Sequence, residues 1–101
     1  MRQRVEYGDH SDGNILCPRC GSGYTHQHEV AVFNRSEDAE EWVCTTVAWR
    51  LINQELNTEG NPSRRRQGLR ISIECEECGE YSGLNIYQHK GQTFIEWEDA
   101  P

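Results

Sequence analysis

The sequence predicts a small, mainly-β protein with an antiparallel sheet of about four strands. Short runs of β-branched and aromatic residues alternate with polar residues, which is the period of half-buried strands. Glycine, proline and asparagine lie between these runs and mark turns. The chain has 101 residues, of which 35% are hydrophobic. It therefore fits a single domain with a thin core.

Two segments in the first half of the chain are expected to be strands. The segment HEVAVFN, residues 28–34, is rich in β-branched residues and alternates along its length. The acidic loop RSEDAEE separates it from WVCTTVAW, residues 42–49. Valine, threonine and tryptophan dominate this second segment and favour a strand.

A helix is the competing prediction for residues 42–52. Asp38 can cap its start, with Glu41 completing a capping box. Four side chains would then share one helical face: Trp42, Thr46, Trp49 and Ile52. The strand is preferred because β-branched and aromatic residues lower the helix propensity of the segment.

A long polar loop and three further strands are expected in the second half. The loop covers residues 53–68 and contains several glycine and proline turn signals. The strands are residues 69–74, 83–89 and 93–98, and the last two form a hairpin with Lys90 and Gly91 at its tip. Sequential antiparallel strands would then form a small meander.

The chain divides into a flexible N-terminal arm, residues 1–14, and a single domain, residues 15–101. No apolar run approaches the roughly 18–20 residues that cross a bilayer, and the charged start MRQRVEYGDH is not a signal peptide. We therefore expect a soluble, cytoplasmic protein without a membrane partner. The net charge of -7 disfavours non-specific binding to nucleic acids.

Two Cys-x-x-Cys-Gly units carry the clearest chemistry: CPRCG at residues 17–21 and CEECG at residues 75–79. A spacing of two residues lets one tight turn aim both sulfurs at one ion, and the glycine after each pair accepts a positive φ. A reducing compartment and an odd total of five cysteines favour metal ligands over disulfides. The prediction is one tetrahedral Zn²⁺ site with four ligands: Cys17, Cys20, Cys75 and Cys78.

The four thiolates would fill the coordination sphere, so the zinc is expected to be structural. A catalytic zinc keeps an open position for water. The fold expected from this site is a zinc ribbon, and the protein is expected not to be an enzyme and to have no small-molecule substrate. The alternative interpretations of the cysteines are two unrelated thiol pairs or a redox pair, which lacks the βαβ context it needs.

Three other groups have a structural and a functional interpretation. Cys44 is expected to be a small buried side chain rather than a ligand. His26 and His28 alternate as ligands of a second metal would, although a partly exposed strand explains them as well. Most aromatic side chains, Trp49 and Trp97 among them, are expected in the core.

A cluster of arginines is the only basic feature of the chain. Guanidinium groups clamp phosphates, or they neutralise the many carboxylates of this acidic sequence. The residues predicted for contact with a macromolecule are Arg64, Arg65, Arg66, Arg70, His89 and Lys90.

The stretches NPSRRRQGLRISIECEECG and IYQHKGQTFIEWE, together with CPRCG and EVAVFNR, resemble small zinc-ribbon proteins of actinobacteria and bacteriophages. The resemblance implies the ribbon fold and a phage-related setting, and it implies no reaction. Most of the residues that carry it lie in two polar loops, residues 61–68 and 88–92, which we therefore expect to form a contact surface.

The expected function is a non-enzymatic binding module that contacts a protein partner and modulates a host macromolecule. The alternative is a nucleic-acid-binding or transcription-related zinc ribbon that uses the arginine-rich loop.

Overall fold

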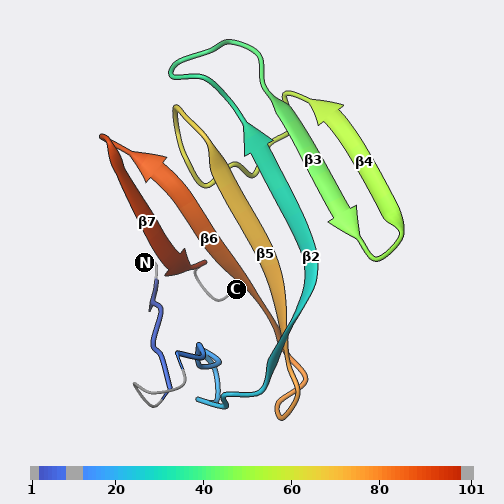
Figure 1. Ribbon diagram of the computed structural model, residues 1–101, viewed down its shortest axis with the longest axis vertical. Coiled ribbons are helices and arrows are strands. Elements are labelled where there is room, and N and C mark those ends of the chain that lie inside the picture. Colours follow the sequence, from blue (N-terminus) through green and yellow to red (C-terminus); the bar gives the residue numbers. More distant parts are fainter. Residues whose placement is uncertain (1–2, 9–12, 99–101) are drawn as a thin grey trace.

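A computed structural model describes residues 3–8 and 13–98 as one antiparallel sheet of seven strands (Figure 1). Six of the strands have six residues or more, and the first has only two. The strands are β1 (Gln3–Arg4), β2 (Thr25–Asn34), β3 (Val43–Ala48), β4 (Leu51–Leu56), β5 (Gly68–Cys75), β6 (Tyr81–His89) and β7 (Gln92–Trp97). Their order across the sheet is β1-β7-β6-β5-β2-β3-β4.

The predicted mainly-β class and the antiparallel sheet are confirmed, but about four strands is too few. Strand β4 occupies the start of the segment predicted as a loop, residues 53–68, and it pairs along its whole length with β3. The helix considered for residues 42–52 is wrong, because these residues form β3 and the beginning of β4. The strand was not predicted because its middle residues are polar: Asn53, Gln54 and Glu55. At the edge of a sheet such side chains are exposed to solvent, so the strand has no alternating apolar pattern in this stretch.

The sheet consists of two three-stranded meanders, β2-β3-β4 and β5-β6-β7, rather than one sequential meander. After β4, residues 57–67 return across the sheet so that β5 pairs with β2, not with β4. This antiparallel pairing sets Thr25 opposite Cys75. The beginning of β2 therefore lies beside the end of β5.

One face of the sheet, which we call the apolar face, has no charged side chain among its strand positions from β2 to β7. The register places on it Val30, Val32, Asn34, Val43, Thr45, Val47, Ile52, Gln54, Leu56, Leu69, Ile71, Ile73, Ser82, Leu84, Ile86, Gln88, Thr93, Ile95 and Trp97. The opposite face carries the charged side chains Glu29, Glu55, Arg70, Glu74 and Glu96.

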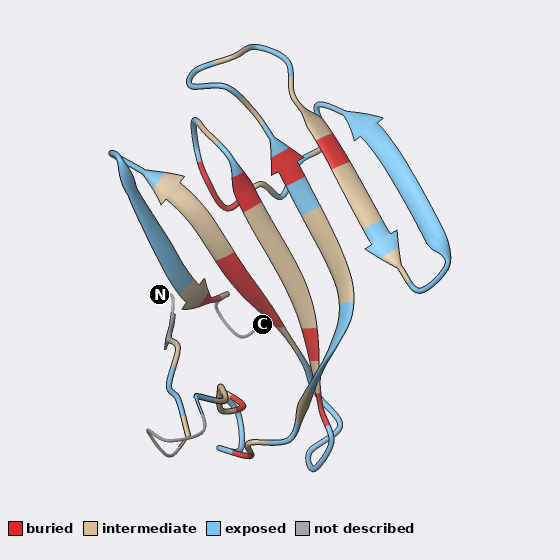
Figure 2. Cartoon of the chain, in the orientation of Figure 1, coloured by how far each residue is buried: buried red, intermediate tan, exposed pale blue. Residues whose placement is uncertain are grey.

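The core lies on one end of the apolar face. Ile73, Leu84 and Trp97 are buried there, and Val5 and Ile15 of the N-terminal segment pack against them. Figure 2 shows this buried part of β6, and it shows strand β4 at the far edge of the sheet exposed along its whole length. At the other end of the sheet, Phe33 and Cys44 are buried on the opposite face.

The expectation that most aromatic residues fill the core is only partly correct. Trp97 is 1% exposed, but Trp49 is 85% exposed at the turn between β3 and β4. Trp49 has a φ of 55°, a conformation that bulky residues rarely adopt. The turn between β3 and the edge strand β4 lies outside the core, so this side chain is not buried.

Part of the predicted arm contacts the sheet. Gln3 and Arg4 pair with β7, and Tyr7 forms an isolated bridge with Ile15. Residues 1–2 and 9–12 of the arm, and residues 99–101 of the domain, lie outside the described residues. The division into arm and domain stays a prediction.

No helix that is long and apolar enough to cross a membrane occurs in residues 3–8 and 13–98.

Candidate metal centre

The pairing of β2 with β5 brings the two Cys-x-x-Cys-Gly units together. We call residues 17–21 the first knuckle and residues 75–79 the second knuckle. The first knuckle precedes β2, and the second begins at the last residue of β5. Since these strand ends are neighbours in the sheet, more than half of the chain separates the knuckles in sequence but not in space.

The four sulfurs form a group that fits one metal ion. All four Sγ atoms lie within 4.8 Å of one another. The Sγ atoms of Cys17 and Cys78 are 3.9 Å apart, and those of Cys20 and Cys75 are 3.5 Å apart. A tetrahedral ion with metal–sulfur bonds of about 2.3 Å separates its sulfurs by about 3.8 Å. The predicted four residues are therefore placed to hold one metal ion.

The two knuckles have the same backbone geometry. Gly21 N–H donates to the Cys17 carbonyl at 2.9 Å, and Gly79 N–H donates to the Cys75 carbonyl at 3.0 Å. The φ angles of these glycines are 80° and 72°. Both values lie in the left-handed region, where a Cβ is unfavourable. The predicted role of the two glycines is thus confirmed.

Burial differs within each knuckle. The first cysteine of each, Cys17 and Cys75, is buried, whereas Cys20 and Cys78 are exposed. The ion would therefore lie at the surface, with one side sealed by the sheet. A set of four thiols leaves no ligand position for water, so this arrangement is suited to a structural ion.

The pKa values of Cys75 and Cys20 shift in opposite directions. Backbone N–H groups, first that of Cys78, lower the pKa of Cys75 to about 6. The backbone at Ser22 lowers the pKa of Cys20, but the hydrogen bond to the Cys75 thiolate and desolvation outweigh this and raise it to about 12. A bound cation would favour all four thiolates at once.

Arg19 joins the first knuckle to the start of β6 and was not singled out in the sequence. Its backbone N–H donates to the sulfur of Cys17 at 3.4 Å. Its guanidinium donates to the Tyr81 carbonyl at 3.1 Å and to the Ser82 hydroxyl at 3.3 Å. These contacts fix the first knuckle to the strand that follows the second knuckle. Its position inside Cys-x-x-Cys was the only sequence signal.

The other candidate ligands lie apart from this cluster. Within residues 3–8 and 13–98, the four cysteines are the only group of three or more potential ligands close enough to share an ion. His26 pairs with Glu76 at 3.4 Å, and His28 packs edge-on against the ring of Tyr81. Cys44 is buried on β3, as predicted for a structural side chain.

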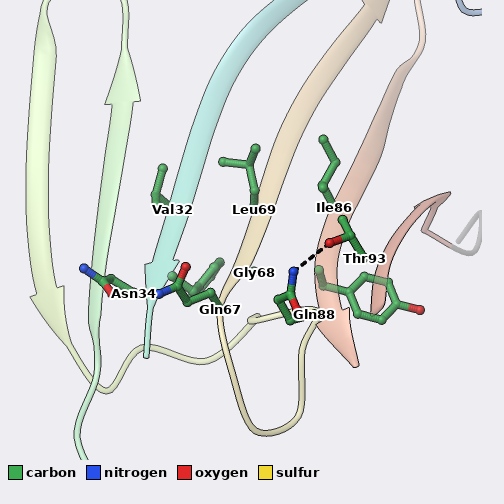
Figure 3. Close-up of a pocket in the computed structure, with 10 residues that line it drawn as sticks. Val32, Asn34, Gln67, Gly68, Leu69, Ile86, Gln88 and Thr93 are labelled. Carbon is green, nitrogen blue, oxygen red and sulfur yellow. Dashed lines mark hydrogen bonds between the residues drawn. The ribbon is translucent and has the colours of Figure 1, made fainter. Parts of the chain in front are cut away.

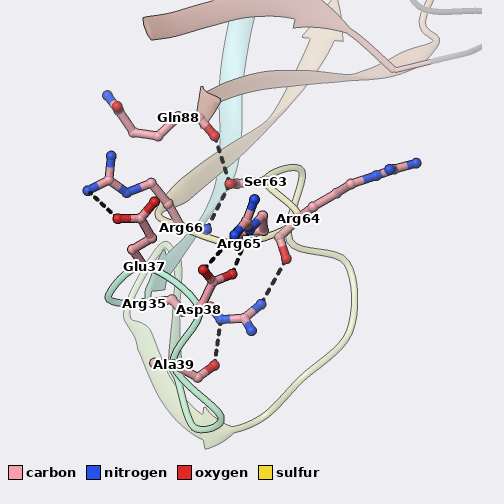
Figure 4. Close-up of polar contacts among 9 residues, drawn as sticks. All are labelled: Arg35, Glu37, Asp38, Ala39, Ser63, Arg64, Arg65, Arg66 and Gln88. Atoms are coloured by element: carbon pink, nitrogen blue, oxygen red, sulfur yellow. Dashed lines mark hydrogen bonds and ion pairs between the residues drawn. The ribbon is translucent and has the colours of Figure 1, made fainter. Parts of the chain in front are cut away.

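The arginines do not form one basic patch (Figure 4). Arg65 makes two hydrogen bonds of 2.6 Å to Asp38, which lowers the pKa of that carboxyl below its usual value. Arg66 pairs with Glu37 at 3.7 Å. Arg70 lies on β5 and forms a two-point ion pair with Glu98, one bond of which is 3.0 Å. Carboxylates thus neutralise three of the four arginines.

Arg64, His89 and Lys90 are more available. Among the described residues, no partner is recorded for the Arg64 side chain, which extends into solvent (Figure 4). His89 and Lys90 line a pocket of about 120 Å³ together with Arg65 and Arg66. This pocket lies at the far end of the sheet from the cysteines, where β6 and β7 turn.

The two loops that carry the sequence resemblance contact each other. The Ser63 hydroxyl donates to the Gln88 carbonyl at 2.8 Å and accepts from the Arg66 N–H at 3.0 Å. Asn61 accepts from the Ser63 N–H and donates to the Arg66 carbonyl, each at 3.0 Å. Asn61 and Ser63 therefore shape the loop itself, which explains these polar positions without a ligand.

Comparison with known proteins finds no match at any level: no family model fits the chain, and neither the curated proteins nor the solved structures contain a significant relative.

Proposed function

We propose that the protein is a non-enzymatic binding module, held together by one structural Zn²⁺ ion, that docks on another protein. Four cysteines at tetrahedral spacing support zinc, because closed four-thiolate sites are typical of structural zinc. The ribbon-like placement of two knuckles beside a sheet supports the same interpretation.

One observation carries the preference for a protein partner. The sheet exposes large apolar side chains on a face without charge, and Ile52 and Leu56 are 74% and 67% exposed. Exposed contiguous apolar surface is a common feature of protein interaction sites. The neutralised arginines support this choice, since paired guanidinium groups are poor phosphate ligands.

Affinity capture tests this proposal. Immobilised zinc-loaded protein is exposed to an extract of the cells that produce it, and retained proteins are identified by mass spectrometry. We expect a retained protein that is lost with Ile52→Arg and kept with Asn53→Arg, its neighbour on the opposite face. Retention that is absent, or equal for both variants, contradicts the proposal. The sequence resemblance suggests a host factor as the partner.

A second candidate function is nucleic-acid binding through Arg64, His89 and Lys90. The pocket of about 120 Å³ between the two loops favours it. Binding to DNA or RNA would weaken between about 50 and about 200 mM salt. Arg64→Ala and Lys90→Ala would each reduce the salt slope by about 1, and the paired Arg65→Ala less. An absence of binding at low salt excludes this candidate.

A further inference from the structure

The apolar face is covered at its metal end and open at the other end. Leu84 and Trp97 are buried beneath the N-terminal segment. Further along the same face, Val32 and Ile95 are 41% and 45% exposed. All strands in the described part of the chain belong to one sheet, so no second layer of strands covers this half.

A continuous apolar row crosses the open half. The register aligns Val32 with Leu69, Leu69 with Ile86 and Ile86 with Ile95, across β2, β5, β6 and β7. Figure 3 shows Val32, Leu69 and Ile86 side by side on neighbouring strands. They form the floor of a shallow hollow of about 350 Å³. At its rim Gln88 donates to Thr93 at 2.6 Å, so this polar group is already satisfied.

The width of the open surface argues against a narrow occupant. Ile52 on β4 and Ile95 on β7 are both exposed, yet four strands lie between them. Six strands about 4.8 Å apart span about 29 Å, whereas a helix is about 10 Å wide. Pairing along the β4 edge would cover Ile52 and leave Ile95 in solvent. Only a layer as broad as the sheet covers both.

A second copy of this chain supplies such a layer. We propose that two copies pack their apolar faces together as a two-layer sandwich. This inference rests on the proposed function and makes a second copy, in place of a host factor, the protein partner. Two identical sheets have the same twist, so they can align as sheets do in sandwiches, about 10 Å apart. Domains normally contain two packed layers, which a single sheet of this chain lacks.

Charge does not oppose this contact. The net charge of -7 would repel two copies, but the strand positions of the apolar face contain no charged residue. Glu29, Glu55 and Glu96 all point to the opposite face, outside the sandwich. Packing the faces together therefore buries no unpaired charge, which would otherwise be costly.

The area is sufficient for a specific dimer. Two or three open alternate positions on each of six strands cover roughly 29 by 17 Å, or about 500 Å² in flat projection. Side-chain relief adds to this value. Standard interfaces bury about 800 Å² per partner, so the open half is of the right order.

Analytical ultracentrifugation of the full, zinc-loaded chain over a wide concentration range tests the inference. We expect a species of twice 11.7 kDa. Ile95→Arg and Ile52→Arg should each raise the dissociation constant of the dimer by about tenfold or more. Asn53→Arg, equally exposed on β4 but on the opposite face, should leave the dissociation constant unchanged. One metal per chain and unchanged circular dichroism establish that each variant is folded.

Two outcomes overturn the sandwich. The first is a folded chain that remains monomeric up to about millimolar concentration. The second is a dimer that resists Ile95→Arg, which would indicate contact elsewhere, such as the β4 edge. A monomer that captures another protein in a manner sensitive to Ile52→Arg would refute the second copy and leave the proposed function standing. A dimer that captures no other protein would support the sandwich and exclude a heterologous partner.

Discussion

The two ends of the apolar face have the same pattern of side chains but opposite environments. Leu84 and Ile86 lie two residues apart on β6 and face the same side of the sheet, yet Leu84 is buried and Ile86 is only half-buried. The difference lies in what covers them. At the metal end the N-terminal segment packs against the face, and at the open end no described residue does so.

The metal site and the core occupy the same end because they share the same segments. Ile15 lies two residues before Cys17, and Ile73 lies two residues before Cys75. An ion that joins the knuckles therefore also holds a covering residue against the face. The comparison teaches that burial in this sheet depends on the segment that covers the face rather than on the pattern of apolar residues alone.

Loss of the metal should have the largest effect. Structural zinc sites contribute apparent binding free energies of about 10–16 kcal/mol, comparable to the whole stability of a domain. Chelation or Cys75→Ser should abolish cooperative thermal unfolding, and low pH should release the metal because protons compete for the thiolates. Cys44→Ala, a buried cysteine outside the cluster, should keep one metal per chain. Unchanged melting after chelation would contradict the coupling of metal and core.

Truncation at the two ends of the face should differ by several-fold. Leu84→Ala removes a buried side chain and should lower the free energy of unfolding by about 2–5 kcal/mol. Ile95→Ala, on the adjacent strand but open to solvent, should cost less than about 1 kcal/mol in the dilute monomer. Urea unfolding at low concentration measures both. Equal costs would mean that the open end is already covered in solution.

Substitution of the knuckle glycine should have a smaller, local effect. Gly79→Ala meets no atom within 4 Å, but its φ of 72° makes a side chain unfavourable by about 1–2 kcal/mol. Gly91→Ala is the matched control, with a φ of 75° and similar free space at the β6-β7 turn. Both should lower stability, but only Gly79→Ala should weaken zinc affinity in competition with a chelator.

The ion pair at the open end should contribute least, because Asp38 and Arg65 are both more than half exposed. The hydrogen bond from Arg65 lowers the pKa of Asp38, so the pair stabilises the fold above the normal aspartate pKa and loses this as pH falls through the lowered value. The coupling measured by a double-mutant cycle with Asp38→Asn and Arg65→Ala should therefore stay constant between about pH 7 and about pH 5. A coupling lost within this range would contradict the assigned pKa direction.

Local patterns in the sequence predicted much of the metal end. The cysteine spacing and the glycines after it act within a few residues, so the positive φ angles were correctly predicted, and the four predicted cysteines lie close enough to hold one ion. Lys90 and Gly91 likewise define a turn by their own conformations. The alternation in LRISIE identified β5, which is a central strand with β6 and β2 on its two sides.

Predictions failed where a neighbour in space decides the outcome. The polar residues of β4 were predicted to form a loop. This strand depends on pairing with β3 rather than on a buried face, and the sequence does not show that pairing. For Arg65 and Arg66 the sequence left both phosphate contact and neutralisation by carboxylates open, and the fold brings Glu37 and Asp38 to them. The exposure of Trp49 could not be read from its apolar character.

By itself, the sequence determined the four cysteines of the candidate metal centre, the turns that carry them and the alternation of the central strands, because each depends on conformations within a few neighbouring residues. The tertiary structure alone decided which strands are neighbours, which charges are neutralised and which half of the apolar face is left open. Those properties depend on residues distant in the chain, and the pairing of β2 with β5 beside the cysteines brings them together.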